Sequence, residues 1–204
     1  GHDVGHTPFG HAGEAVLQKF MPGFKHNYQS VRVLEFLEKK ASGKNLNLTW
    51  EVIDGIKHHS GNGEASTLEG RLLKFADRIA YVNHDIDDSI RAGVLKEDDL
   101  PGEARAILGN TPSERINTMV CAVIRASLDK PYITMEEPYY SASKEFRAFM
   151  FREVYTNSLV KGENDKLHYI IENIFSYYME NPDALPKKHL DLYTDEHESD
   201  SLDV

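Results

Sequence analysis

Residues 1–14 of the chain read GHDVGHTPFGHAGE, and this stretch governs the interpretation of everything that follows it. It combines three imidazoles with two carboxylates: His2, His6, His11, Asp3 and Glu14. Glycine and proline between them prevent one regular helix, so we expect a helix end, a tight loop and a new helix start. A single His-Asp dipeptide is commonly chance. So many titratable groups in one glycine-rich turn instead indicate a bound ligand, and the His2–Asp3 pair offers the mixed donors that suit Zn, Mn, Fe, Ni or Mg.

Length and composition indicate one soluble globular domain with a sizeable core. The chain has 204 residues, 40% hydrophobic and 27% charged. No run approaches the ~20 apolar residues of a membrane span, and no signal-peptide pattern opens the chain. The single cysteine, Cys121, excludes an internal disulfide and fits a reducing cytosol, so a cytoplasmic location is expected.

The net charge of −10 argues against general nucleic-acid binding, which needs a basic face. It leaves a nucleotide substrate open, because a metal ion and a few well-placed basic side chains can hold a triphosphate inside an acidic protein.

Hydrophobic periodicity predicts an all-α fold. Apolar residues recur at helical spacing, and glycine, proline or capping residues bound the segments. No segment shows convincing strand alternation. The expected helices are residues 12–21, 27–40, 49–59, 66–91, 103–108, 112–130, 141–160 and 165–180.

Several polar residues fall at the ends or on one face of these helices. His11 and Glu14 are three apart and share a face of the first turn, where the carboxylate can orient the imidazole as a catalytic histidine requires. His26 precedes a helix that Asn27 can cap, so its side chain can point into a cleft.

Other candidates have two interpretations each. His59 ends a helix, where it either favours the helix dipole or lines a substrate cleft. Arg78 follows Asp77 and either reaches a phosphate or forms a surface ion pair. Lys144 and Arg147 on the 141–160 helix either reach a substrate in an assembled oligomer or, as we expect, are charges on a solvated face.

Three segments carry a resemblance to a known family. Residues 2–3 with 5–14 (HD and GHTPFGHAGE), residues 26–32 (HNYQSVR) and residues 76–88 (ADRIAYVNHDIDD) resemble the HD-domain phosphohydrolases, in particular the deoxyguanosinetriphosphate triphosphohydrolase branch. The likeness is strong over residues 1–95. It implies an HD-domain helical bundle with additional C-terminal helices: a metal and catalytic core over 1–95, a continuous helical extension over 96–185, and an acidic tail or truncated segment over 186–204.

The resemblance also implies a metal centre. His2, Asp3 and Asp77 would bind a divalent ion (Mn, Mg, Co, Ni, Fe or Zn), together with a histidine from a helix upstream of the His-Asp pair. That helix does not precede Gly1 in this chain, so we expect a truncation at the N-terminus, with weakened metal affinity. A truncation at the C-terminus is one of the two interpretations of residues 186–204.

The implied reaction is hydrolysis of a deoxynucleoside triphosphate, with dGTP favoured, to deoxynucleoside and tripolyphosphate. By the same resemblance, His11 with Glu14 would orient or activate water, and His26 would donate a proton to the leaving 5′-oxygen. Tyr81 would pack against the sugar and exclude a 2′-hydroxyl, with His59 and Arg78 as further substrate contacts. A homo-oligomer is also implied.

Three alternatives compete with this interpretation. Another HD phosphohydrolase (a 5′-deoxynucleotidase, or an alarmone or cyclic-nucleotide hydrolase) would share the metal ligands but would not be expected to keep residues 10–14 or 26–30. A catalytically impaired nucleotide-binding regulator is the second. A structural oligomerisation module is the third, and it leaves the glycine-rich histidine stretch unexplained.

Overall fold

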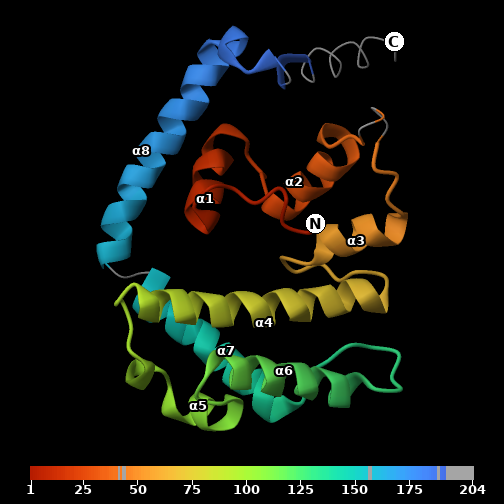
Figure 1. Cartoon of the computed structure of the whole chain (residues 1–204), viewed down its shortest axis with the longest axis vertical. Helices are drawn as coiled ribbons and strands as arrows, with labels where there is room; N and C mark the ends of the chain where they lie inside the picture. The colour runs from red at the N-terminus through yellow and green to blue at the C-terminus, as the bar shows by residue number, and fades with distance from the viewer. Residues whose placement is uncertain (41, 43–44, 156–157, 188, 192–204) are drawn as a thin grey trace. The chain divides into compact units, whose positions relative to one another are not determined.

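The computed structural model describes residues 1–40, 42, 45–155, 158–187 and 189–191, with the side chains of all of these except 158–164. Within these ranges the predicted all-α fold is confirmed (Figure 1). The only extended pairing there is one isolated antiparallel bridge between Lys39 and Asn45. No helix in the described part is long and apolar enough to cross a membrane. The helices are α1 (Gly10–Phe20), α2 (His26–Arg32), α3 (Trp50–His58), α4 (Leu68–Arg91), α5 (Gly102–Leu108), α6 (Pro112–Ser127), α7 (Glu137–Met150) and α8 (Ser158–Glu180).

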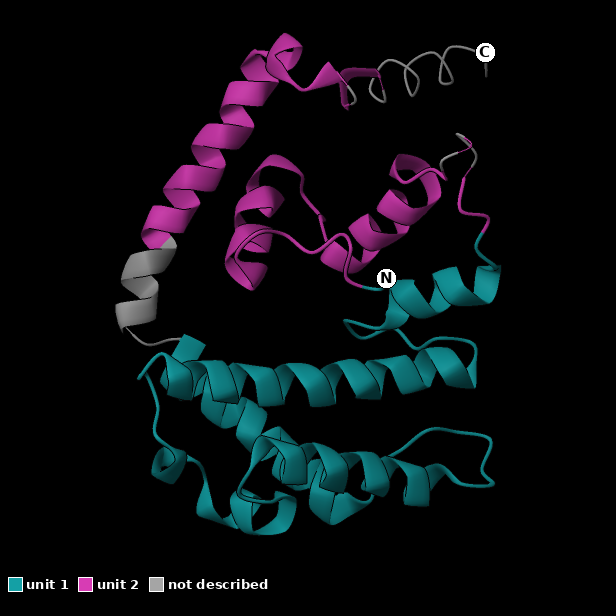
Figure 2. Ribbon diagram, in the orientation of Figure 1, with its two compact units in different colours: residues 1–2, 48–162 teal, residues 3–47, 163–204 magenta. Residues whose placement is uncertain are grey.

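The chain forms two compact units (Figure 2). Unit 1 comprises residues 1–2 and 48–162, and unit 2 comprises residues 3–47 and 163–204. The expected boundary at residue 95 separates a catalytic core from a helical extension, whereas the two units are defined by their internal contacts. The expected boundary therefore stays a prediction. Most of the expected acidic tail, residues 188 and 192–204, lies outside the described residues.

Unit 1 is built around α4, which packs against α3, α6 and α7. Its buried stripe follows the helical period through Ile79, Val82 and Ile86. Thr67 begins the helix, because its hydroxyl accepts a hydrogen bond from the Gly70 amide at 3.1 Å. The other helices of unit 1 complete this core with fully buried side chains that include Leu108, Met119 and Phe146.

The helix expected over 141–160 begins earlier than predicted and changes its winding. α7 starts at Glu137, because Pro138 is tolerated in the first helical turn. After Met150 the chain continues as a π-helical turn, Phe151–Tyr155. Such wide turns are common at functional sites, and here the Tyr155 hydroxyl donates a hydrogen bond to the Asp85 carboxylate on α4.

In unit 2 the N-terminal loop lies directly against α2. The Gly5 amide donates to the Ser30 hydroxyl at 3.0 Å. A Cβ on Gly5 would lie 2.1 Å from the Ser30 nitrogen, and one on Gly13 would lie 2.0 Å from the Pro8 oxygen. These two glycines therefore permit a backbone approach that no other residue allows. On the far side of α1, the Phe20 ring packs on Phe175 of α8 with centroids 4.5 Å apart.

The loop between α3 and α4 is tied to both helices. The Asp54 carboxylate accepts the Ser66 amide at 2.7 Å and lies 2.9 Å from His58 Nδ1. The Ser66 amide lowers the pKa of Asp54, and the charge of His58 lowers it further against the opposing effect of burial. From α4, the Lys74 ammonium donates to the Gly61 and Gly63 carbonyls at 2.8 and 2.6 Å.

We expect Gly5→Ala to destabilise the chain by about 1 to 3 kcal/mol, because the added methyl group meets backbone atoms of α2 that cannot rotate away. Gly102→Ala is the matched control, since a Cβ there would have no heavy atom within 4 Å. Urea unfolding followed by circular dichroism measures both. Equal midpoints for the two variants would contradict the close packing of the loop.

We expect acid sensitivity to depend on Asp54. Its folded pKa lies below the ordinary 3.8, so its contribution to stability is present above that value and is lost as pH falls through the lower folded pKa. Asp54→Asn should therefore flatten the decline in unfolding free energy between about pH 5 and pH 3. Asp98→Asn, at a side chain 94% exposed, is the control. An unchanged slope in Asp54→Asn would refute the assignment.

Candidate active site

The predicted metal ligands come together around His2. Its Nε2 atom lies 3.4 Å from Asp77 Oδ1 on α4. Asp3 follows His2 in the chain, and a carboxylate oxygen of Asp3 lies within 4.8 Å of a ring nitrogen of His2. The sequence had linked Asp77 to the pair only through a resemblance, whereas the structure gives the contact itself.

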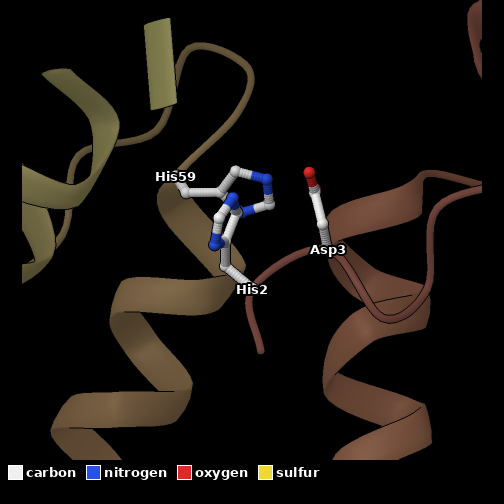
Figure 3. Close-up of side chains that lie close together, drawn as sticks. All are labelled: His2, Asp3 and His59. Atoms are coloured by element: carbon white, nitrogen blue, oxygen red, sulfur yellow. The ribbon is translucent and has the colours of Figure 1, made fainter. Parts of the chain in front are cut away.

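His59 belongs to the same cluster. Ligand atoms of His2, Asp3 and His59 all lie within 4.8 Å of one another, and Figure 3 shows the two imidazole rings facing the end of the Asp3 side chain. The His2 and His59 ring centroids are 4.9 Å apart in an edge-on arrangement. Imidazole nitrogens and carboxylate oxygens in such a group fit a divalent transition-metal ion. We call His2, Asp3, His59 and Asp77 the metal cluster.

A second group of histidines lies in unit 2. Glu14 Oε2 is 2.7 Å from His26 Nδ1 and also accepts the His26 backbone amide at 3.2 Å. The His6 ring lies 5.0 Å from the His26 ring and 6.5 Å from the His11 ring. We call these four residues the histidine cluster. A hydrogen bond from the His6 amide to the Asp3 carbonyl, at 3.0 Å, joins it to the His2–Asp3 pair.

The histidine cluster corrects one prediction and adds one residue. Helical spacing predicted that Glu14 would orient His11, but its carboxylate contacts His26, and His11 is exposed. Local spacing could not anticipate a partner twelve residues away on another helix. His6 was not predicted as a site residue. Its only sequence signal was its place inside the 1–14 stretch, and the contact with His26 comes from the fold of the loop.

Unit 1 also contains a cavity of about 200 Å³. Arg78 and Tyr81, both predicted substrate contacts, line it from α4. Lys144 and Arg147 line it from α7. Their side chains are exposed, as expected, but their place on this cavity was not predicted from the sequence, which gives no sign that the two helices meet here. His59 does not line the cavity and lies in the metal cluster instead.

The electrostatics of the cavity favour an anion. Three basic side chains, Arg78, Lys144 and Arg147, line it although the chain is acidic overall. Burial raises the pKa of Tyr81, and burial followed by the hydrogen bond to Asp85 raises the pKa of Tyr155. Both phenols therefore stay protonated over the ordinary pH range. Tyr81 lines the cavity and can donate a hydrogen bond there, whereas Tyr155 donates its proton to Asp85.

Comparison with known proteins adds two matched regions. Residues 2–82 match the HD domain, and residues 133–203 match the phosphohydrolase-associated domain. The first region contains the metal and histidine clusters. The cavity takes Arg78 and Tyr81 from the first region and Lys144 and Arg147 from the second.

Curated relatives agree with these matches. The chain is 50% identical over 193 residues to a deoxyguanosinetriphosphate triphosphohydrolase-like protein of Caldanaerobacter subterraneus subsp. tengcongensis, covering 94% of this chain and 56% of that protein. Proteins of the same name from Clostridium tetani and Clostridium perfringens are 46% and 47% identical, each over 96% of this chain and over 59% and 60% of their own lengths. The chain therefore spans somewhat more than half of these relatives.

The two matched regions and the identities near one half agree with one another and with the clustered HD residues. The chain belongs to the HD-domain phosphohydrolases, and over most of its length it is similar to deoxyguanosinetriphosphate triphosphohydrolase-like proteins.

Proposed function

We propose that this protein hydrolyses deoxynucleoside triphosphates, with dGTP favoured, to the deoxynucleoside and tripolyphosphate. The observation that carries the proposal is the cavity with three basic side chains, one of which, Arg78, directly follows the metal-cluster carboxylate Asp77 on α4. A single phosphate needs fewer basic partners. A triphosphate carries enough charge to engage all three.

The spacing on α4 supports a substrate that extends from the metal cluster into the cavity. Asp77 and Tyr81 are four residues apart and share a face, with a rise of about 6 Å between them. Arg78 would contact phosphate oxygens of the substrate, and Lys144 and Arg147 would contact its remaining phosphate groups. Tyr81 would pack against the sugar, where a ring close to the 2′ position selects deoxyribose.

The metal ligands in this proposal are His2, Asp3 and Asp77, with a further histidine N-terminal to the His-Asp pair, as the resemblance implies. When bound, a divalent ion (Mn, Mg, Co, Ni, Fe or Zn) would polarise a phosphoryl oxygen and lower the pKa of a bound water. The acidic and imidazole donors around His2 match this requirement.

The histidine cluster would move the protons. Glu14 accepts from His26 Nδ1, which fixes the orientation of the ring and leaves Nε2 to exchange a proton with the substrate. His26 is proposed to protonate the leaving 5′-oxygen, because an alkoxide is a poor leaving group at neutral pH. His11, whose side chain is exposed, would orient the attacking water.

A homo-oligomer is part of the proposal. Ile170, Ile174 and Tyr177 form a stripe along α8 at helical spacing, and their side chains are 45%, 54% and 53% exposed. Apolar stripes of this kind are typical of a contact with another protein surface.

Product analysis tests the reaction. The natural protein that contains this sequence is incubated with dGTP, the other deoxynucleoside triphosphates and GTP, each with Mn, Co or Mg. Ion-exchange chromatography is expected to show tripolyphosphate and deoxynucleoside in equal amounts, with dGTP the best substrate and GTP poor. Orthophosphate or pyrophosphate as the product would favour another HD phosphohydrolase. Nucleotide-dependent thermal stabilisation without any product would favour a regulator.

Arg147 supplies a sharper test of the cavity. Arg147→Gln removes a charge-assisted hydrogen bond to phosphate, so kcat/KM for dGTP should fall about 10- to 100-fold. Arg152→Gln is the matched control, since this arginine lies five residues further on, is 62% exposed and does not line the cavity. Equal kcat/KM for the two variants would remove the cavity from the substrate site.

A further inference from the structure

The His59 side chain is buried where a surface histidine would be expected. It follows the last residue of α3, yet it is only 2% exposed and packs edge-on against His2. A buried polar ring is stable only when its nitrogens are satisfied. The surroundings of the two ring nitrogens therefore define what His59 does.

One nitrogen is satisfied by the backbone. His59 Nδ1 lies 2.6 Å from the Ile56 carbonyl oxygen. A carbonyl can only accept, so Nδ1 carries the proton and Nε2 carries the lone pair in the neutral ring. A histidine that ligates a metal typically has its other N–H bonded to a backbone carbonyl or a carboxylate in this way.

The ligand atoms of the neighbouring groups lie close to the separations that ligands of one ion adopt. Two ligands on opposite sides of an ion, each at about 2.1 Å, are about 4.2 Å apart. The ligand atoms of His2, Asp3 and His59 lie within 4.8 Å of one another, so a small side-chain rotation brings all three onto one ion. Asp77 joins the same group through His2, at 3.4 Å.

We infer that His59 is a direct ligand of the bound metal, rather than the substrate contact that its position in the sequence indicated. This assignment rests on the metal site of the proposed function and adds a ligand to it. Two imidazoles with two carboxylates favour a divalent transition ion such as Mn, Co or Zn over Mg, which prefers oxygen donors alone.

The inference is tested by metal affinity, without turnover. His59→Asn removes Nε2 while an amide N–H replaces Nδ1–H toward the Ile56 carbonyl. His84→Asn makes the same chemical change at an exposed position of unit 1 outside the metal cluster. His2→Asn removes a ligand that the proposed function already contains. Calorimetric and visible-absorption titrations of the 204-residue chain with Co²⁺ measure all four proteins.

Losing a ligand should raise the Co²⁺ dissociation constant at least about tenfold, since even outer partners of metal ligands are worth 10- to 100-fold. We expect this increase for His59→Asn and His2→Asn, and no change for His84→Asn. Wild-type affinity in His59→Asn with a loss in His2→Asn would overturn the His59 assignment alone. Equal affinity in all four proteins would overturn the metal site of the proposed function as well.

A second measurement needs no substitution and decides the question if His59→Asn fails to fold. In wild-type protein labelled with ¹⁵N-histidine and assigned through the backbone, diamagnetic Zn²⁺ should shift Nε2 of His59 to a metal-bound position. The ratio of Mg²⁺ to Co²⁺ dissociation constants should also be well above one. An unmoved His59 Nε2 signal at saturating Zn²⁺ would refute the proposal.

Discussion

Asp77, Tyr81 and Asp85 follow one another at intervals of four along α4, and the continuous backbone hydrogen bonding of this helix fixes their separations. The first contacts His2, the second lines the cavity, and the third accepts the hydrogen bond from Tyr155. A break in α4 would change all three relations together. The buried residues Ile79, Val82 and Ile86 anchor the same helix in the core. The packing of unit 1 therefore also fixes the positions of Asp77, Tyr81 and Asp85.

The sequence predicted those features that depend on local pattern. Helical periodicity predicted the all-α fold. The resemblance to the HD family grouped Asp77 with His2 and Asp3, whereas His59 was expected as a substrate contact. Prediction from the sequence failed where a side chain contacts a residue that is distant along the chain. Spacing on one helix paired Glu14 with His11, whereas the carboxylate bonds a histidine from the next helix. Lys144 and Arg147 carried no local sign of a cavity, because the helix that shares it with them lies more than fifty residues earlier.

The net charge of the whole chain and the charge around the cavity have opposite signs. A net charge of −10 describes the whole chain and bears on its solubility and on its general partners. The cavity is lined by three basic groups and by the phenol of Tyr81, whose pKa is raised by burial. Asp77 carries a carboxylate and the next residue of α4, Arg78, carries a guanidinium, so the proposed cation site and the proposed anion site are adjacent along this helix. A metal–phosphate complex has this pattern of charge.

Hydrogen bonds to the side chains of Asp54 on α3 and Lys74 on α4 hold the backbone of the α3–α4 loop. None of these bonds uses a side chain of the metal cluster, so protein contacts alone order the backbone next to His59 when the chain folds. A cation that binds at His59, as we infer, would order almost no additional backbone, so little of the coordination free energy would be lost to conformational entropy. The affinity of such a centre is set by its donor atoms, and its ligands need not assemble around each ion that arrives.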